Sequence, residues 1–430
     1  MLILNMRHLK QHLLKSLSLW ILLGVWVSAG AQQADSLAGY LKEAASGNPG
    51  LKAKYSLYQA ALEKIPQAGS LPDPEMQFSF FITPMELIAG NQLADIRVMQ
   101  MSPWFGTLKA AKDEASKMAL ARYEEMLGVK NDLYLEVKTA WYQVFRIRKE
   151  IGITEKNLDL LKSLERMALI RFKAAGMGNS GQGGLVGLLR AQMEIGSLEN
   201  RLALLGDQLK TSKVRFNSYL NRNKDSEVFV GDSLPEATLP GSTSILADSI
   251  LNNPMIRMYE AEKAANESRV IMAKKMGYPM IGLGLNYSVI QQRPGATSMM
   301  NGNDMIMPMV TATLPIYRKK QIARQREAGY LRDAAGESAV DARNELTVSF
   351  QESMEQLKDA ERRVELYNRQ ASLAEKSVSL LTSSFSTAGT NFEEILRMQQ
   401  QLLDYQYKHI EAVVDRNTAI ARLLSIISHN

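Results

Sequence analysis

The feature that most constrains the fold of this chain is an internal duplication. Asn48-Pro49 recurs as Asn253-Pro254, and Pro74 recurs as Pro279 at the same offset. A repeat whose copies each span about half of the chain is a whole structural unit rather than a short motif. The sequence therefore predicts two fused copies of one unit, each with a helix, two strands, a very long helix, a turn and a further long helix.

The segments after Pro74 and after Pro279 alternate apolar and polar residues with the period of two that indicates a strand, and each is followed by a second predicted amphipathic strand. Each is close to the roughly 9 to 11 residues that a tilted membrane strand needs. The second pair is separated by a longer loop than the first pair. The predicted strands lie near residues 75–84, 94–103, 279–290 and 306–315.

Long helices are predicted after each strand pair. The segment Thr107–Ala175 lacks Pro and carries apolar residues at spacings of four and three, and so does the second copy from Phe350 to Phe385. This spacing predicts coiled-coil seams. A helix of roughly 70 residues is on the order of 100 Å long. The later helix, about 185–221, and the short helix 51–67, laid end to end, nearly match the length of this long helix. This match indicates a rod of paired helices.

The beginning of the chain has the pattern of a secretory signal peptide. Three basic residues precede the apolar run Leu17–Val27, and Ala29-Gly30-Ala31 forms a small-residue cleavage site. The apolar run is too short for a spanning helix, which needs about 20 residues. We therefore expect residues 1–31 to be removed and the mature chain, from Gln32, to be exported.

The composition excludes several classes of function. The chain has no Cys, which excludes disulfides, thiolate zinc sites and a lipidated N-terminal Cys. After residue 31 the only histidines are His409 and His429, and no nucleophile or phosphate-binding motif is present. The net charge of +6 decreases when three basic residues leave with the signal peptide. We expect no enzymatic activity, no cofactor and no nucleic-acid partner.

Methionine is the one unusual residue type, with 23 in the chain. Thioethers are soft ligands that suit Cu(I), but Met also fills irregular gaps and faces lipid. We assign no metal site on this basis. The local run consists of Met299, Met300, Met305, Met307 and Met309.

The strands also constrain the assembly. After the signal peptide no apolar stretch is long enough for a spanning helix, so membrane insertion would require a β-barrel. Four strands cannot close one, because bacterial barrels begin at about eight strands and lipid does not tolerate open edges. A cyclic homo-oligomer follows. The alternative is an exported coiled-coil structural protein, or a periplasmic adaptor, in which the strands form a small cap and no channel.

Over nearly its whole mature length the chain resembles the TolC family of outer-membrane efflux proteins. The resemblance is carried by the two Asn-Pro pairs, by Pro103–Gly106 and Leu314–Tyr317 after the strands, and by the turns before Leu185–Gln192 and Ala388–Leu396. It implies a mainly helical fold with a small β part: a homotrimer with a shared 12-stranded outer-membrane β-barrel and a periplasmic α-barrel of antiparallel coiled-coil helices. The implied function is the passive exit duct of a tripartite efflux pump. Its implied partners are a periplasmic adaptor, an inner-membrane RND-type pump and outer-membrane lipid.

The resemblance also implies a site at the helix tips. Inward carboxylates commonly narrow the entrance shortly after the second tip, where this chain has Glu393 and Glu394, followed by Arg397. Segments 71–74 and 103–107 are similar to members that accompany heavy-metal pumps, so heavy-metal cations are one implied cargo. The adaptor-contact residues implied at the tips are Gly184, Leu185, Val186, Leu188, Gly389 and Thr390.

The predicted boundaries follow the duplication. The first repeat spans residues 32–222, with its strand hairpin at about 75–103. A connector rich in Asn, Asp, Gly, Ser and Pro spans 223–250. The second repeat spans 251–430, with its hairpin at about 279–315.

Overall fold

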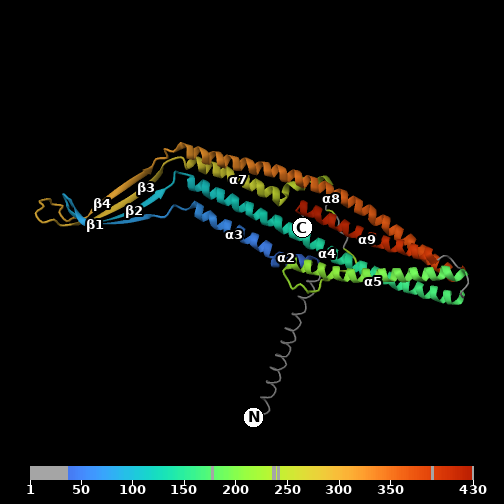
Figure 1. Cartoon of the computed structure of the whole chain (residues 1–430). Coiled ribbons are helices and arrows are strands. Elements are labelled where there is room, and N and C mark those ends of the chain that lie inside the picture. Colours follow the sequence, from blue (N-terminus) through green and yellow to red (C-terminus); the bar gives the residue numbers. More distant parts are fainter. Residues whose placement is uncertain (1–36, 176–178, 235–238, 240–242, 389–391, 429–430) are drawn as a thin grey trace, which may run out of the picture. The chain divides into compact units, whose positions relative to one another are not determined.

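The computed structural model describes residues 37–175, 179–234, 239, 243–388 and 392–428 (Figure 1). The expected signal peptide lies outside these residues. No helix among the described residues is both long enough and apolar enough to cross a membrane. The elements in chain order are α2 (Leu37–Gly47), α3 (Pro49–Gly69), β1 (Glu75–Leu87), β2 (Gly90–Ser102), α4 (Thr107–Ala175), α5 (Asn179–Leu220), α6 (Thr243–Ser249), η1 (Ile250–Asn252), α7 (Pro254–Lys275), β3 (Met280–Gln291), β4 (Met305–Thr313), α8 (Arg318–Ala388) and α9 (Phe392–Ile426).

The chain divides into two compact units. Of the described residues, those within Met1–Lys52, Val129–Ile250 and Leu346–Asn430 form the helical unit, and those within Ala53–Gly128 and Leu251–Glu345 form the sheet unit. Each unit takes elements from both sequence copies, so the compact units differ from the repeats. The repeat boundaries stay a prediction about the sequence, because the duplicated halves intertwine rather than fold separately.

The sheet unit contains one antiparallel sheet in the order β1-β2-β3-β4. The four predicted strands are present, and their observed bounds differ from the expected ones by a few residues. A tight turn joins β1 to β2, whereas residues 292–304 join β3 to β4, which is where the second copy was expected to be longer. The register brings Met99 opposite Gly284, and Gly284 opposite Met309.

This register gives the sheet two chemically different faces. Successive side chains of a strand point to opposite faces. One face, which we call the apolar face, is defined by Met76, Phe78, Phe80, Ile96, Val98, Ile281, Leu283, Leu285, Tyr287, Val289, Ile306 and Val310. The other, which we call the polar face, is defined by Gln77, Ser79, Asp95, Arg97, Met99, Met101, Gly282, Gly284, Asn286, Ser288, Met305, Met307, Met309 and Thr311.

The duplicated Asn-Pro pairs have the same structural role in both copies. Asn253 is the N-cap of α7 and its side-chain oxygen accepts a hydrogen bond from the Met255 amide at 2.9 Å. Asn48 accepts one from the Leu51 amide at 3.1 Å, directly before α3. Asn is a preferred N-cap and Pro is preferred at the first helical position, so these dipeptides start their helices. The three-dimensional structure thus confirms this part of the predicted duplication.

The coiled-coil seams of the helical unit are where the sequence predicts them. On α4, the residues with four-three spacing from Leu133 to Ile147 are buried. On α8, the buried members of the predicted seam are Phe350, Met354, Leu357, Ala360, Ala374, Val378 and Phe385. Spacing alone was sufficient here, because only one stripe of such a helix faces its partner.

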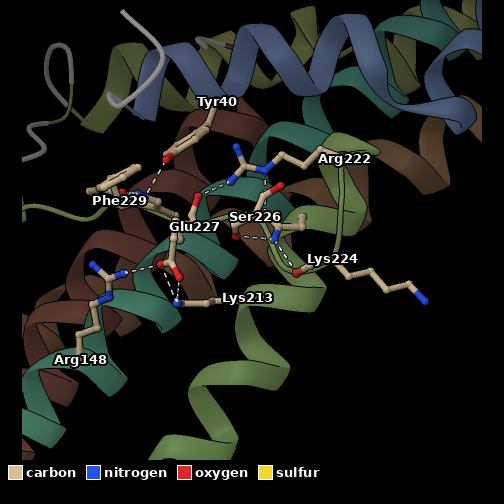
Figure 2. A network of polar contacts seen from close by, with 10 residues as sticks. Tyr40, Arg148, Lys213, Arg222, Lys224, Ser226, Glu227 and Phe229 are labelled. Atoms are coloured by element: carbon tan, nitrogen blue, oxygen red, sulfur yellow. Dashed lines mark hydrogen bonds and ion pairs between the residues drawn. The ribbon is translucent and has the colours of Figure 1, made fainter. Parts of the chain in front are cut away.

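The predicted connector, 223–250, is partly helical and its first part is packed. Its later part forms α6 and begins η1, whereas Val228 and Leu234 before it are buried. Figure 2 shows how polar contacts hold this first part: the Phe229 amide donates to the Tyr40 hydroxyl at 3.0 Å, and Lys213 donates to the Glu227 carboxylate at 2.7 Å. The first part of the connector is therefore anchored to the helical unit by two buried side chains and these polar contacts.

Candidate functional site at the helix tips

Four helix ends of the helical unit meet in one apolar cluster. They are the C-terminal ends of α4 and α8 and the N-terminal ends of α5 and α9. Residues 176–178 and 389–391, which join these ends, lie outside the described part of the chain. We call the buried cluster the tip cluster. Its members are Leu158, Leu161, Leu164, Ala168, Ala191, Leu198, Phe385, Phe392, Ile395 and Leu396.

Helices α5 and α9 approach each other closely within this site. A Cβ atom on Gly187 would lie 2.8 Å from Cδ1 of Phe392, closer than real Cβ contacts. The Phe392 ring is buried and packs against Phe385 with 5.5 Å between ring centroids. Only a glycine at 187 leaves room for this ring. The absence of a side chain at this position of α5 therefore allows the two helices to approach each other this closely.

Both predicted entrance carboxylates lie in the first turn of α9 and both are paired with arginine. Glu393 forms an ion pair with Arg190 of α5. Glu394 forms one with Arg397 at 2.6 Å, one turn further along α9. Carboxylates in a first turn also favour the positive end of the helix dipole. Because each carboxylate has a cation beside it, the tip offers less negative charge than its Glu content alone suggests.

The predicted adaptor-contact residues differ in exposure. Leu185 and Val186 are 42% and 52% exposed, whereas Leu188 is only 8% exposed and packs inside the chain. Gly184 was expected in a turn but lies within α5, which begins at Asn179. Gly389 and Thr390 lie outside the described residues. The described tip therefore presents Leu185 and Val186 on its surface.

A polar layer, which the sequence analysis missed, lies behind the tip cluster. Thr154 of α4 shares a hydrogen bond of 2.6 Å with the Tyr407 hydroxyl of α9. Asn157 donates to Gln406 at 3.1 Å and accepts from Gln399. Burial raises the pKa of the Tyr407 phenol. The polar layer is defined by Thr154, Asn157, Gln399, Gln406 and Tyr407.

One signal for the polar layer was available in the sequence. Thr154 continues the four-three spacing of the α4 seam from Ile147 and Ile151. A polar residue at a seam position usually finds a buried partner, because an unsatisfied polar group inside a protein costs free energy. Its partners on α9 are far away in the sequence and have no pattern that identifies them.

The fold resembles that of solved outer-membrane channels. No known family profile matches the sequence. No curated protein shows significant sequence similarity. Among solved structures, the outer-membrane channel OprN matches with a TM-score of 0.76 and 17% identity, over 93% of this chain and 92% of that one.

Two further channels have the same architecture. CusC, studied for its folding and transmembrane channel formation, matches with a TM-score of 0.75 and 13% identity, over 91% of each chain. The open MtrE outer-membrane channel of Neisseria gonorrhoeae matches with a TM-score of 0.73 and 13% identity, over 91% of this chain and 89% of that one. The chain therefore has, over nearly its whole length, the fold of these outer-membrane channels.

Proposed function

We propose that this chain is one subunit of an outer-membrane exit duct, which works with a periplasmic adaptor and an inner-membrane RND-type pump. The observation that carries the proposal is the exposed apolar face of the sheet. Met76, Phe78 and Phe80 on β1 are 59%, 57% and 79% exposed. An apolar surface of this kind on a soluble protein would need a cover, whereas lipid supplies one directly.

The two outer strands of the sheet support the assembly part of the proposal. Among the described residues, β1 and β4 each pair with a strand on one side only, so the outer edge of each has a row of backbone donors and acceptors without a strand partner. In lipid such groups need partners, and strands of neighbouring copies provide them. Three chains with four strands each give the 12-stranded barrel that the resemblance implies.

Aromatic residues at one end of the sheet unit support membrane placement. Trp104 follows β2 and stacks on Tyr278, which precedes β3, with 5.3 Å between ring centroids. Phe105, next to Trp104, and Tyr317, between β4 and α8, are largely exposed. Aromatic side chains form girdles where a membrane meets water, because their rings are apolar and their polar atoms reach water.

The helix tips are the proposed entrance and adaptor contact. The exposed Leu185 and Val186 suit burial against an apolar helix face of an adaptor. In a symmetric assembly, Glu393 and Arg190 would each occur once per subunit and form rings of charge that affect passing ions. Since Glu393 and Arg190 are paired, we propose that the net charge at the entrance is close to zero rather than negative.

The cargo belongs to the proposal as well. Segments 71–74 and 103–107 support heavy-metal cations, delivered by the pump, as one cargo class. The duct itself needs no catalytic group, so we propose no enzymatic role.

An exported coiled-coil protein or an adaptor without a channel is the competing interpretation. It does not explain why the apolar face of the sheet is exposed.

Planar-bilayer conductance of the purified protein tests the proposal. The parent should give discrete conductance steps. Arg190→Gln, which leaves the Glu393 charge without its partner, should increase the preference for cations, and Glu393→Gln should decrease it. Arg166→Gln, which removes an exposed arginine of α4 outside the Arg190–Glu393 pair, is the matched control and should behave like the parent. Insertion without discrete steps in the parent and in every variant would reject the duct.

A further inference from the structure

The strand methionines collect on the polar face of the sheet. Most of them share that face, although the apolar face is where packing or lipid would favour thioethers. Met99 and Met101 come from β2, and the neighbouring strand β3 places Gly282 and Gly284 opposite them. Beyond β3, Met309 of β4 lies opposite Gly284. The two glycines thus form a gap between methionines of two strands.

The sulfur atoms of the β2 methionines lie over this gap. Met99 Sδ is 3.1 Å from the points where Cβ atoms of Gly282 and of Gly284 would stand. Met101 Sδ is closer still to the point on Gly282. Two thioether sulfurs therefore converge above one glycine. Any side chain at 282 would displace both of them.

Gap filling by methionine is the plain alternative to a ligand role. Met adapts to irregular spaces and packs well where a glycine leaves room. Packing alone, however, does not explain why thioethers are placed on a face that otherwise carries Gln77, Arg97, Asn286 and Thr311. Leu or Ile would fill the same space, and only the thioether contributes lone pairs.

We propose that Met99 and Met101 form a binding site for a soft monovalent cation, Cu(I) or Ag(I), over Gly282. Thioether sulfur is a soft ligand that selects such cations over hard ones. Met309, across Gly284, is placed to supply a third sulfur. The exposed loop residues Met299 and Met300 are not part of the site. Binding is a property of the sheet unit alone and does not depend on the proposed duct.

Silver binding to the purified full-length protein tests this site. Ag(I) is titrated calorimetrically in chloride-free buffer, with Met99→Leu/Met101→Leu as the test variant. Leu for Met conserves volume and is well tolerated in packed sites, so the variant should keep its fold. We expect Ag(I) affinity to fall at least tenfold in the double variant and by less in each single variant.

The control removes the same number of thioethers elsewhere. Met299→Leu/Met300→Leu should bind Ag(I) as the parent does. Equal Ag(I) affinity of the parent and Met99→Leu/Met101→Leu would overturn the site, as would the absence of binding by the parent. Neither result would affect the proposed duct, because conductance is measured without silver.

Discussion

The close approach of α5 and α9 makes Gly187→Ala the most informative substitution at the tips. A methyl group there would stand 2.8 Å from the Phe392 ring, which is enclosed by the tip cluster and by Phe385. Overpacking a filled core costs about 1–3 kcal/mol. Ala instead of Gly in a helix returns about 1 kcal/mol. We therefore expect a net local destabilisation of about 1 kcal/mol.

Gly196→Ala is the matched control on the same helix. A Cβ at Gly196 meets nothing within 4 Å. This variant gains the helix-propensity term without the clash, so it should stabilise α5 by about 1 kcal/mol. The two variants should then differ by about 2 kcal/mol, which is roughly a 30-fold difference in the opening equilibrium.

Hydrogen-exchange mass spectrometry of the purified protein measures this difference. Peptides that cover the first turns of α5 should exchange faster than the parent in Gly187→Ala and more slowly in Gly196→Ala. Peptides from the sheet unit serve as an internal reference and should not change. If the start of α5 is equally protected from exchange in the two variants, glycine at 187 does not set the spacing of α5 and α9.

Three further predictions concern the seam, a half-buried histidine and a helix cap. Leu357→Asp places a charge at a 5% exposed seam position and should cost roughly 3–5 kcal/mol in thermal unfolding, whereas Leu380→Asp, at 72% exposure, should leave the melting temperature nearly unchanged. Burial, and then the charge of Arg416, lower the pKa of His409 below its ordinary 6.5. The unfolded chain therefore binds the proton more readily, and the free energy of unfolding should fall as the pH drops below about 6.5. His409→Gln should weaken this pH dependence of the melting temperature, and an unchanged dependence would count against the prediction. Asn253→Ala removes the cap of α7 and should cost about 1 kcal/mol in the same melting assay, with an unaltered melting temperature as the contrary result.

Much of the fold could be predicted because its elements carry strong periodic patterns. The first strand of each pair was recognisable from alternation, and the seam from Phe350 to Phe385 from its four-three spacing. Such patterns can be read locally, because they reflect which face of each helix or strand packs against other residues. The Asn-Pro pairs marked the duplication, and their role as helix starts became clear from the structure.

The missed features depend on contacts between distant segments. The glycine-rich start of α5 is a poor helix former, yet it is helical from Asn179. Packing of the neighbouring tip cluster outweighs the weak local preference. Likewise, the pairing of Glu393 with Arg190 joins two helices far apart in the sequence. The sequence gives the charge of each residue, but it does not show which distant residue lies beside it in the folded chain.

In the proposed duct, four strands per chain form a membrane structure only together with other copies. Native mass spectrometry of the protein extracted in mild detergent from isolated outer membranes tests it most directly. We expect a single species with three times the mass of the mature chain. A species with the mass of one chain, or recovery of the protein only in the soluble periplasmic fraction, would contradict it.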